Sequence, residues 1–112
     1  MRLACDNYDQ ISVVSLKGEL TAEEVQRFRQ AALDRMERDR IRDFVLDCAD
    51  LEFVDSQGLE ALLWLQEQCA QRLGQVRLAA CRDNVLTILQ ITRLISRFDL
   101  HPDAPSALKS LR

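Results

Sequence analysis

The feature that most constrains this chain is a strand-to-helix transition between residues 43 and 65. The run Phe44–Leu46 is continuously apolar, as expected for a strand buried in a parallel sheet. The tetrapeptide Asp55-Ser56-Gln57-Gly58 follows soon afterwards and leads into a strongly apolar helix from Leu59. A serine at the start of such a helix lies among backbone amides that lack helical partners. We therefore look for function first at this transition.

The sequence on either side of this transition predicts alternating strands and helices. Thr21 and Glu24 fit a capping box at the start of the first helix, and Gly74 is suited to be the C′ residue of the central helix. We expect strands at residues 2–6, 11–16, 44–48, 75–80 and 95–100, and helices at 21–38, 56–73, 83–91 and 106–111. Residues 1–112 should thus form a single α/β domain. Its mixed sheet of four to five strands has an N-terminal hairpin and is packed by about four helices.

Composition and charge argue against several classes of protein. Hydrophobic residues make up 47% of the chain, charged residues 29%, and the net charge is −3. Acidic and basic residues alternate, whereas a nucleic-acid-binding surface needs a basic stripe. No apolar run approaches the roughly 18 residues that a membrane span needs, and residues 1–6 lack the apolar core of a signal peptide. We expect a cytoplasmic protein without a membrane span.

The cysteine and histidine pattern predicts neither a metal site nor another cofactor. Cys5, Cys48, Cys69 and Cys81 are widely spaced, without a C-x-x-C pair, and His101 is the single histidine, before Pro102 in a predicted turn. Cys48, Cys69 and Cys81 fall in apolar patterns. They are expected to be buried and reduced.

Ser56 has two compatible interpretations. At the N-cap or N1 position its simplest role is structural, because serine is a favoured N-cap residue. The same position would accept a phosphate group without breaking the fold, since helix amides favour an anion there. The phosphate would add about −1.5 to −2 charges at pH 7, next to Asp55, and so alter recognition of a partner.

Ser56 lacks the surroundings of a catalytic nucleophile. The hydrolase motif G-x-S-x-G requires a glycine where Val54 stands, and His101 is far along the chain. Phosphate-binding glycine-rich loops are also absent from the sequence, which has three glycines in all. We therefore expect no catalytic residue and no enzymatic activity.

Five ordered motifs extend over nearly the whole chain: Gly18-Glu19-Leu20, Leu46-Asp47, Asp50-Leu51, the string Phe53-Val54-Asp55-Ser56-Gln57-Gly58-Leu59, and Val76-Arg77-Leu78-Ala79. Together these motifs resemble the STAS domain family, in its anti-sigma factor antagonist type. The resemblance agrees with the α/β fold derived above.

The resemblance implies a phosphorylation switch. Ser56 would be the phosphoacceptor of a partner serine kinase, often itself an anti-sigma factor, which binds the unphosphorylated form and releases its sigma factor. A metal-dependent, PP2C-type phosphatase would reset the switch. Asp55, Gln57, Gly58 and Thr21 are the expected loop and partner-binding residues.

Thr21 and Trp64 both bear on recognition by a partner. Thr21 stands where family members often have an aspartate after G-E-L, which puts recognition by a standard kinase in question. Trp64 is predicted on the polar side of the central helix, among Glu60, Glu67 and Gln71, where it could anchor a partner. Alternatively, a neighbouring helix or loop covers it.

Two other functions remain open at this point. The chain could be a constitutive STAS interaction module in a larger signalling or transport complex, with Ser56 only a helix cap. A small-molecule or nucleotide binder, with the helix N-terminus as its anion site, is the third possibility.

Overall fold

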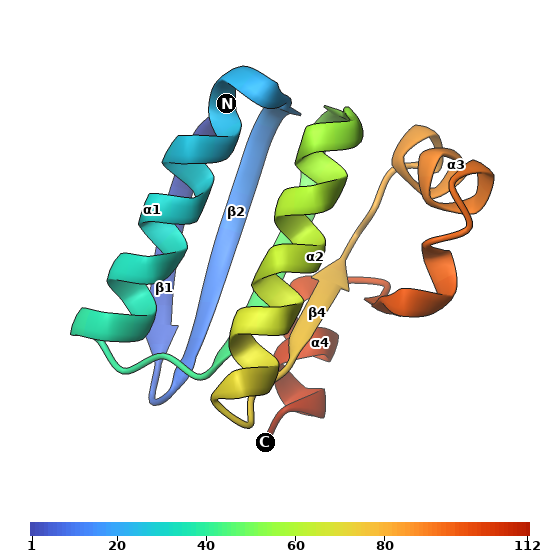
Figure 1. Ribbon diagram of the computed structural model, residues 1–112. Coiled ribbons are helices and arrows are strands. Elements are labelled where there is room, and N and C mark those ends of the chain that lie inside the picture. The colour runs from blue at the N-terminus through green and yellow to red at the C-terminus, as the bar shows by residue number, and fades with distance from the viewer.

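The computed structural model describes residues 1–112 as a five-stranded sheet covered by helices (Figure 1). The strand order is β1-β2-β3-β4-β5. The strands are β1 (Arg2–Tyr8), β2 (Ile11–Leu20), β3 (Asp43–Val54), β4 (Val76–Ala79) and β5 (Asp99–His101). The helices are α1 (Ala22–Arg38), α2 (Ser56–Gln71), α3 (Asp83–Ile91) and α4 (Ala104–Ser110), with a 3-10 turn, η1 (Ile95–Arg97), before β5.

The sheet is mixed, as the sequence predicts. β1 and β2 form an antiparallel hairpin, whereas β2, β3, β4 and β5 run parallel to one another. β4 pairs only with residues 44–47 of β3, so residues 48–54 continue beyond β4 with β2 as their ladder partner. We call residues 48–54 the β3 arm, because they extend past β4 and end at the predicted site.

Helices cover both faces of the sheet. α1 and α2 lie side by side on one face, and α4 lies on the other (Figure 1). The main core lies beneath α1 and α2 and is built from fully buried side chains such as Leu16, Phe44, Leu46 and Leu65. A smaller cluster under α4 contains Ile11, Val45, Ala79 and Ala107. β3 is buried on both faces over its first half, which explains its continuously apolar sequence.

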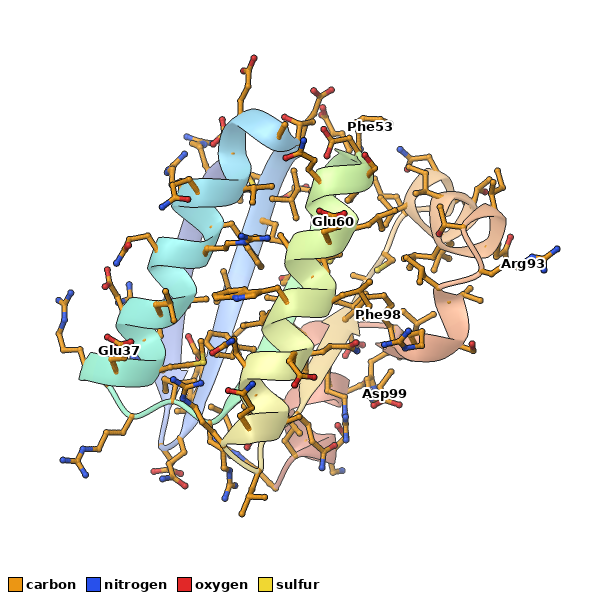
Figure 2. The ribbon with its side chains drawn as sticks, in the orientation of Figure 1. Glu37, Phe53, Glu60, Arg93, Phe98 and Asp99 are labelled. Atoms are coloured by element: carbon orange, nitrogen blue, oxygen red, sulfur yellow. The ribbon has the colours of Figure 1, made fainter.

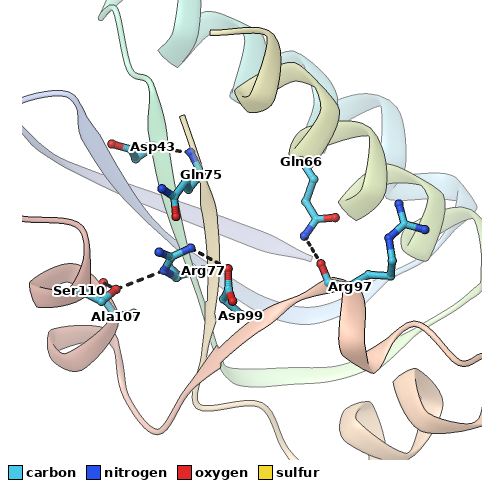
Figure 3. A network of polar contacts seen from close by, with 8 residues as sticks. All are labelled: Asp43, Gln66, Gln75, Arg77, Arg97, Asp99, Ala107 and Ser110. Atoms are coloured by element: carbon cyan, nitrogen blue, oxygen red, sulfur yellow. Dashed lines mark hydrogen bonds and ion pairs between the residues drawn. The ribbon is translucent and has the colours of Figure 1, made fainter. Parts of the chain in front are cut away.

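Polar contacts join the elements at the end of the sheet opposite the predicted site (Figure 3). The buried carboxylate of Asp43 accepts a 2.8 Å hydrogen bond from the backbone amide of Gln75, which fixes the start of β4 beside β3. Arg77 on β4 donates to Asp99 on β5 at 2.8 Å and to Ser110 on α4 at 3.2 Å. A single arginine therefore links three elements there.

The predicted capping box at Thr21 is wrong. Thr21 is the N-cap residue of α1, but its side chain makes no capping hydrogen bond. The Glu24 carboxylate pairs instead with Arg27 on the next turn, at 3.5 Å. The first amide of α1, that of Ala22, is bound by the carboxylate of Asp55, which lies 33 residues further along the chain.

The central helix ends at Gln71, two residues before the predicted end, and its C′ residue is shifted by one position. Leu73, not Gly74, takes the left-handed conformation, with φ of 61°. The amides of Leu73 and Gly74 then bond to the carbonyls of Ala70 and Cys69, in a Schellman motif. Gly74 is needed for another reason: a Cβ atom there would lie 1.9 Å from the Arg42 carbonyl oxygen.

The C-terminal third differs from expectation at its last strand. Residues 95–97 form the 3-10 turn η1, and only Asp99–His101 pair with β4. His101 thus ends a strand, where a turn was predicted. None of the helices combines the length and apolarity that crossing a membrane requires.

Candidate functional site

The site forms where β2 and β3 end side by side. Leu20 and Val54 are paired at the last position of the parallel ladder, and the Asp55 amide donates to the Leu20 carbonyl at 3.2 Å. α1 and α2 therefore begin next to each other. Gly58 makes this approach possible, because a Cβ atom there would lie only 2.2 Å from the Leu20 carbonyl oxygen.

Asp55 caps both helices at once. Its Oδ1 atom accepts from the backbone amide of Gly58 at 2.8 Å, which is the N3 amide of its own helix, α2. Its Oδ2 atom accepts from the amide of Ala22, the first residue of α1, at 2.9 Å. These amides, first that of Gly58 and then that of Ala22, lower the pKa of the Asp55 carboxyl from its usual value. A single carboxylate thus supplies acceptors for two helix N-termini.

Ser56 is free of this structural task. It is the first residue of α2, it is exposed, and its hydroxyl group makes no hydrogen bond within the chain. Of the two positions predicted for Ser56, N-cap and N1, the structure shows N1, because Asp55 holds the N-cap position. The hydroxyl group lies at the positive end of a 16-residue helix and faces solvent.

Phe53 is an exposed aromatic side chain three residues before Ser56, and the sequence analysis did not identify it. Its side chain is 42% exposed, and it lies beside the start of α2 (Figure 2). The cause is a β-bulge: Gly18 pairs with Leu51 and Glu19 with Phe53, which leaves Glu52 unpaired. The extra residue reverses the alternation of the strand. The adjacent apolar pair Phe53-Val54 is the signal that could have shown this, because only one of the two can face the core.

The β3 arm that carries this site is fastened to α3. The side chain of Arg82 donates to the Ala49 carbonyl at 2.8 Å and lies 3.8 Å from the Asp50 carboxylate. Asn84 donates to the Glu52 carbonyl. The arm is therefore held by β2 along one edge and by the start of α3 along the other.

The structure brings five of the six predicted site residues together: Thr21, Asp55, Ser56, Gln57 and Gly58. Ser56 and Gln57 are exposed, Thr21 and Asp55 are half-buried, and Gly58 is buried. Gly58 thus acts through backbone packing and presents no surface to a partner. No group of three or more His, Cys, Asp or Glu side chains is arranged to hold a metal ion.

Trp64 lies apart from these residues. It is eight residues along α2 from Ser56, about 12 Å at the helical rise, and it packs half-buried against the core. The guanidinium group of Arg29 on α1 lies 5.4 Å from the centre of its ring. Of the two alternatives for Trp64, an exposed anchor or a ring covered by a neighbouring element, the structure shows the second, because α1 lies beside it. Its part in partner binding stays a prediction.

Comparison with known proteins places this geometry in a family. The family model of the STAS domain matches residues 2–107. The chain belongs to the STAS domain family. It is 29% identical over 101 residues to BtrV of Bordetella bronchiseptica, named as a candidate anti-sigma factor antagonist, with 88% of this chain and 84% of BtrV covered.

Solved structures of STAS proteins match over almost the full chain. An anti-sigma factor antagonist from Mycobacterium paratuberculosis is 26% identical, with a TM-score of 0.84 and coverage of 99% of this chain and 93% of that one. SpoIIAA of Bacillus in its phosphorylated form is 17% identical, with a TM-score of 0.78 and coverage of 99% and 100%. At that identity the likeness concerns the fold alone.

The same fold also occurs inside larger proteins. The murine anion transporter Slc26a9 matches with a TM-score of 0.76 at 19% identity, and the match covers 95% of this chain but 18% of the transporter. Antagonist proteins and this transporter thus share the fold.

Proposed function

We propose that this STAS domain is an anti-sigma factor antagonist-like switch, controlled by phosphorylation of Ser56. The observation that carries the proposal is the division of labour between two adjacent residues. Asp55 makes the hydrogen bonds that hold α1 and α2 together. Ser56 presents an unbonded, exposed hydroxyl group at the first position of α2. A kinase could modify Ser56 without removing any contact on which the fold depends.

The physical effect of a phosphate group at Ser56 would be local. The helix N-terminus favours an anion, so phosphorylation should leave α2 intact. The surface changes more: about −1.5 to −2 charges are added beside the Asp55 carboxylate and one turn from Glu60. A partner that packs an apolar surface on Phe53 would have to desolvate this phosphate, which is costly without a paired cation.

The proposed partner of the unphosphorylated form is a serine kinase that is also an anti-sigma factor, and a PP2C-type phosphatase would reverse the modification. Membership of the family and the likeness to named antagonists support this assignment. The site is an open surface: no surface pocket is lined by Asp55, Ser56 or Gln57. Such a surface suits a protein partner better than a nucleotide, which binds in a concave site. The chain acts as substrate and ligand, with no catalytic residue of its own.

A constitutive interaction module is the second candidate function. Thr21 favours it, because family members often carry an aspartate at this position and here the side chain does not cap α1. The occurrence of the fold within an anion transporter is compatible with such a role. In this case Ser56 would be an ordinary surface residue, and modifying it would leave binding unchanged.

Affinity capture with a charge variant distinguishes the two functions. The tagged protein with Ser56→Asp, with Ser56→Ala and without substitution would be expressed in its own cells, and co-purifying serine kinases quantified by mass spectrometry. Ser96→Asp is the matched control, since Ser96 is an exposed serine in the turn η1. The switch predicts loss of the kinase with Ser56→Asp alone. Equal recovery of the same partners with all four proteins would support the constitutive module.

A further inference from the structure

Two of the four free cysteines are brought together by the sheet. Cys48 is the first residue of the β3 arm and is buried, and Cys81 follows β4 by two residues. The parallel register pairs Asp47 with Ala79. Ala80 then adopts a left-handed conformation, with φ of 58°. Cys81 consequently packs against the same core cluster that contains Cys48.

The two thiols interact directly. The neighbouring Cys81 side chain, followed by burial, raises the pKa of Cys48 well above its usual value, whereas the Cys48 side chain lowers the pKa of Cys81. The Cys48 thiol itself donates to the Leu46 carbonyl at 3.5 Å. Cys69 has no such partner, and burial raises the pKa of its thiol to about 12. Cys81 is therefore a better nucleophile than a buried, isolated thiol.

Only one thiol of the pair is accessible. Cys81 is half-exposed and lines an open pocket of about 290 Å³, together with Ala80, Leu86, Leu100, His101 and Pro102. Cys48 is 2% exposed. A small oxidant entering this pocket reaches Cys81 first, and Cys48 lies in the core cluster against which Cys81 packs. An accessible thiol with a second thiol in contact is the usual arrangement of a redox-active pair.

We propose that Cys48 and Cys81 form a redox-active dithiol that closes to a disulfide on reaction with a small peroxide. The Cys81 thiolate attacks one oxygen of hydrogen peroxide, the O–O bond breaks, and the released hydroxide takes up a proton to become water. Cys81 is then a sulfenic acid. The Cys48 sulfur attacks the Cys81 sulfur, the S–O bond breaks, and the leaving hydroxide takes the Cys48 proton. The two thiols lose two electrons, and one peroxide becomes two waters.

The disulfide would join β3 to the segment that enters α3, at the base of the arm that carries Phe53 and Ser56. Arg82 already binds this arm through the carbonyl of Ala49, so the covalent bond reinforces an existing contact. The proposal does not rest on phosphorylation of Ser56. Its failure would leave the proposed function unaffected.

Thiol counting on the full chain tests the pair. The protein is treated with hydrogen peroxide, denatured, alkylated and analysed by intact mass and peptide mapping. We expect loss of two of the four thiols, a mass decrease of about 2 Da for the two hydrogens, and a peptide link between Cys48 and Cys81 that dithiothreitol reverses. Cys5→Ser and Cys69→Ser, singly and combined, should leave this result unchanged.

Single substitutions of Cys48 and Cys81 test which thiol reacts first. With Cys48→Ala, Cys81 should accumulate as a sulfenic acid that dimedone traps; with Cys81→Ala, Cys48 should stay reduced in the folded protein. Two results would overturn the proposal. One is oxidation of Cys5 or Cys69 ahead of Cys81. The other is a wild-type protein in which the two thiols do not react as a pair. In that case Cys81 resists a peroxide concentration that oxidises glutathione, or Cys81 is oxidised while Cys48 remains available for alkylation.

Discussion

The N-termini of α2 and α4 use the same local device for different purposes. In each, an aspartate precedes the helix and accepts a hydrogen bond from the N3 amide: Asp55 from Gly58 at 2.8 Å, and Asp103 from Ser106 at 2.7 Å. Asp103 makes its contacts within its own turn. Asp55 also binds Ala22 across the molecule. One aspartate is thus a local cap and the other a joint between two helices, and the joint leaves its neighbouring serine exposed.

Substitutions at the N3 positions of α2 and α4 should differ most in their effect on the free energy of unfolding. Gly58→Ala places a Cβ atom 2.2 Å from the Leu20 carbonyl oxygen, so the two helix starts must move apart. We expect a loss of about 2 to 4 kcal/mol in the free energy of unfolding, measured by urea denaturation. Ser106→Ala, the matched change in α4, should cost less than about 0.5 kcal/mol. Similar values for the two variants would show that the close approach at Gly58 is unimportant.

Substitutions of the two capping aspartates should show the second-largest difference in stability. Asp55→Ala removes acceptors from two helix N-termini, and we expect it to destabilise the protein by about 2 kcal/mol. Asp103→Ala removes acceptors from α4 alone and should have a smaller effect in the same denaturation experiment. In addition, Asp55→Ala should speed amide exchange at Ala22 in hydrogen-exchange measurements, whereas Asp103→Ala should leave that amide unchanged.

Acid should weaken both caps. Hydrogen bonds from backbone amides lower the pKa of both carboxyl groups from the usual 3.8. The main contribution comes from the Gly58 amide for Asp55 and from the Ser106 amide for Asp103. The unfolded chain therefore binds protons more readily than the folded one, and the stability from each group is present above pH 3.8 and lost as pH falls through the folded pKa. Denaturation midpoints measured from pH 6 downward should fall less steeply for Asp55→Asn and Asp103→Asn than for the wild type. A slope unchanged by Asp55→Asn would contradict the double cap.

The smallest effect on stability is expected from a charge at the first helical position. Ser56→Asp places a carboxylate at a helix N-terminus, which favours it by about 0.3 to 1 kcal/mol, and the neighbouring Asp55 offsets part of this gain. This variant should unfold within about 0.5 kcal/mol of the wild type. Thermal unfolding monitored by circular dichroism checks this. A large loss with Ser56→Asp would mean that the modification acts by disrupting the fold.

The sequence was a good guide to the elements and a poor guide to contacts between them. Alternating strand and helix patterns predicted the hairpin, the parallel sheet and the place of Ser56, because hydrophobic periodicity is local information. The bond between Asp55 and Ala22 spans 33 residues, and no local pattern encodes it. The Thr21 side chain was therefore predicted to cap α1, whereas the side chain that binds an amide at the start of α1 is that of Asp55.

The exposure of Phe53 and of Trp64 could not be predicted from the sequence for a related reason. Phe53 faces outward because a bulge at Glu52 reverses the alternation, and the bulge depends on the register with β2. Trp64 is covered because α1 packs along that side of α2 and brings Arg29 over its ring. Helical periodicity gives the direction of a side chain, but not which neighbour lies in that direction.

Phosphopeptide analysis of the protein recovered from its own cells tests most directly whether Ser56 is a phosphoacceptor. We expect an increment of about 80 Da, one phosphate group, on the peptide that contains Ser56. It should be absent with Ser56→Ala and retained with Ser96→Ala, a change at another exposed serine. Unmodified Ser56 across growth and stress conditions, at full coverage of that peptide, would contradict the switch and favour a constitutive module.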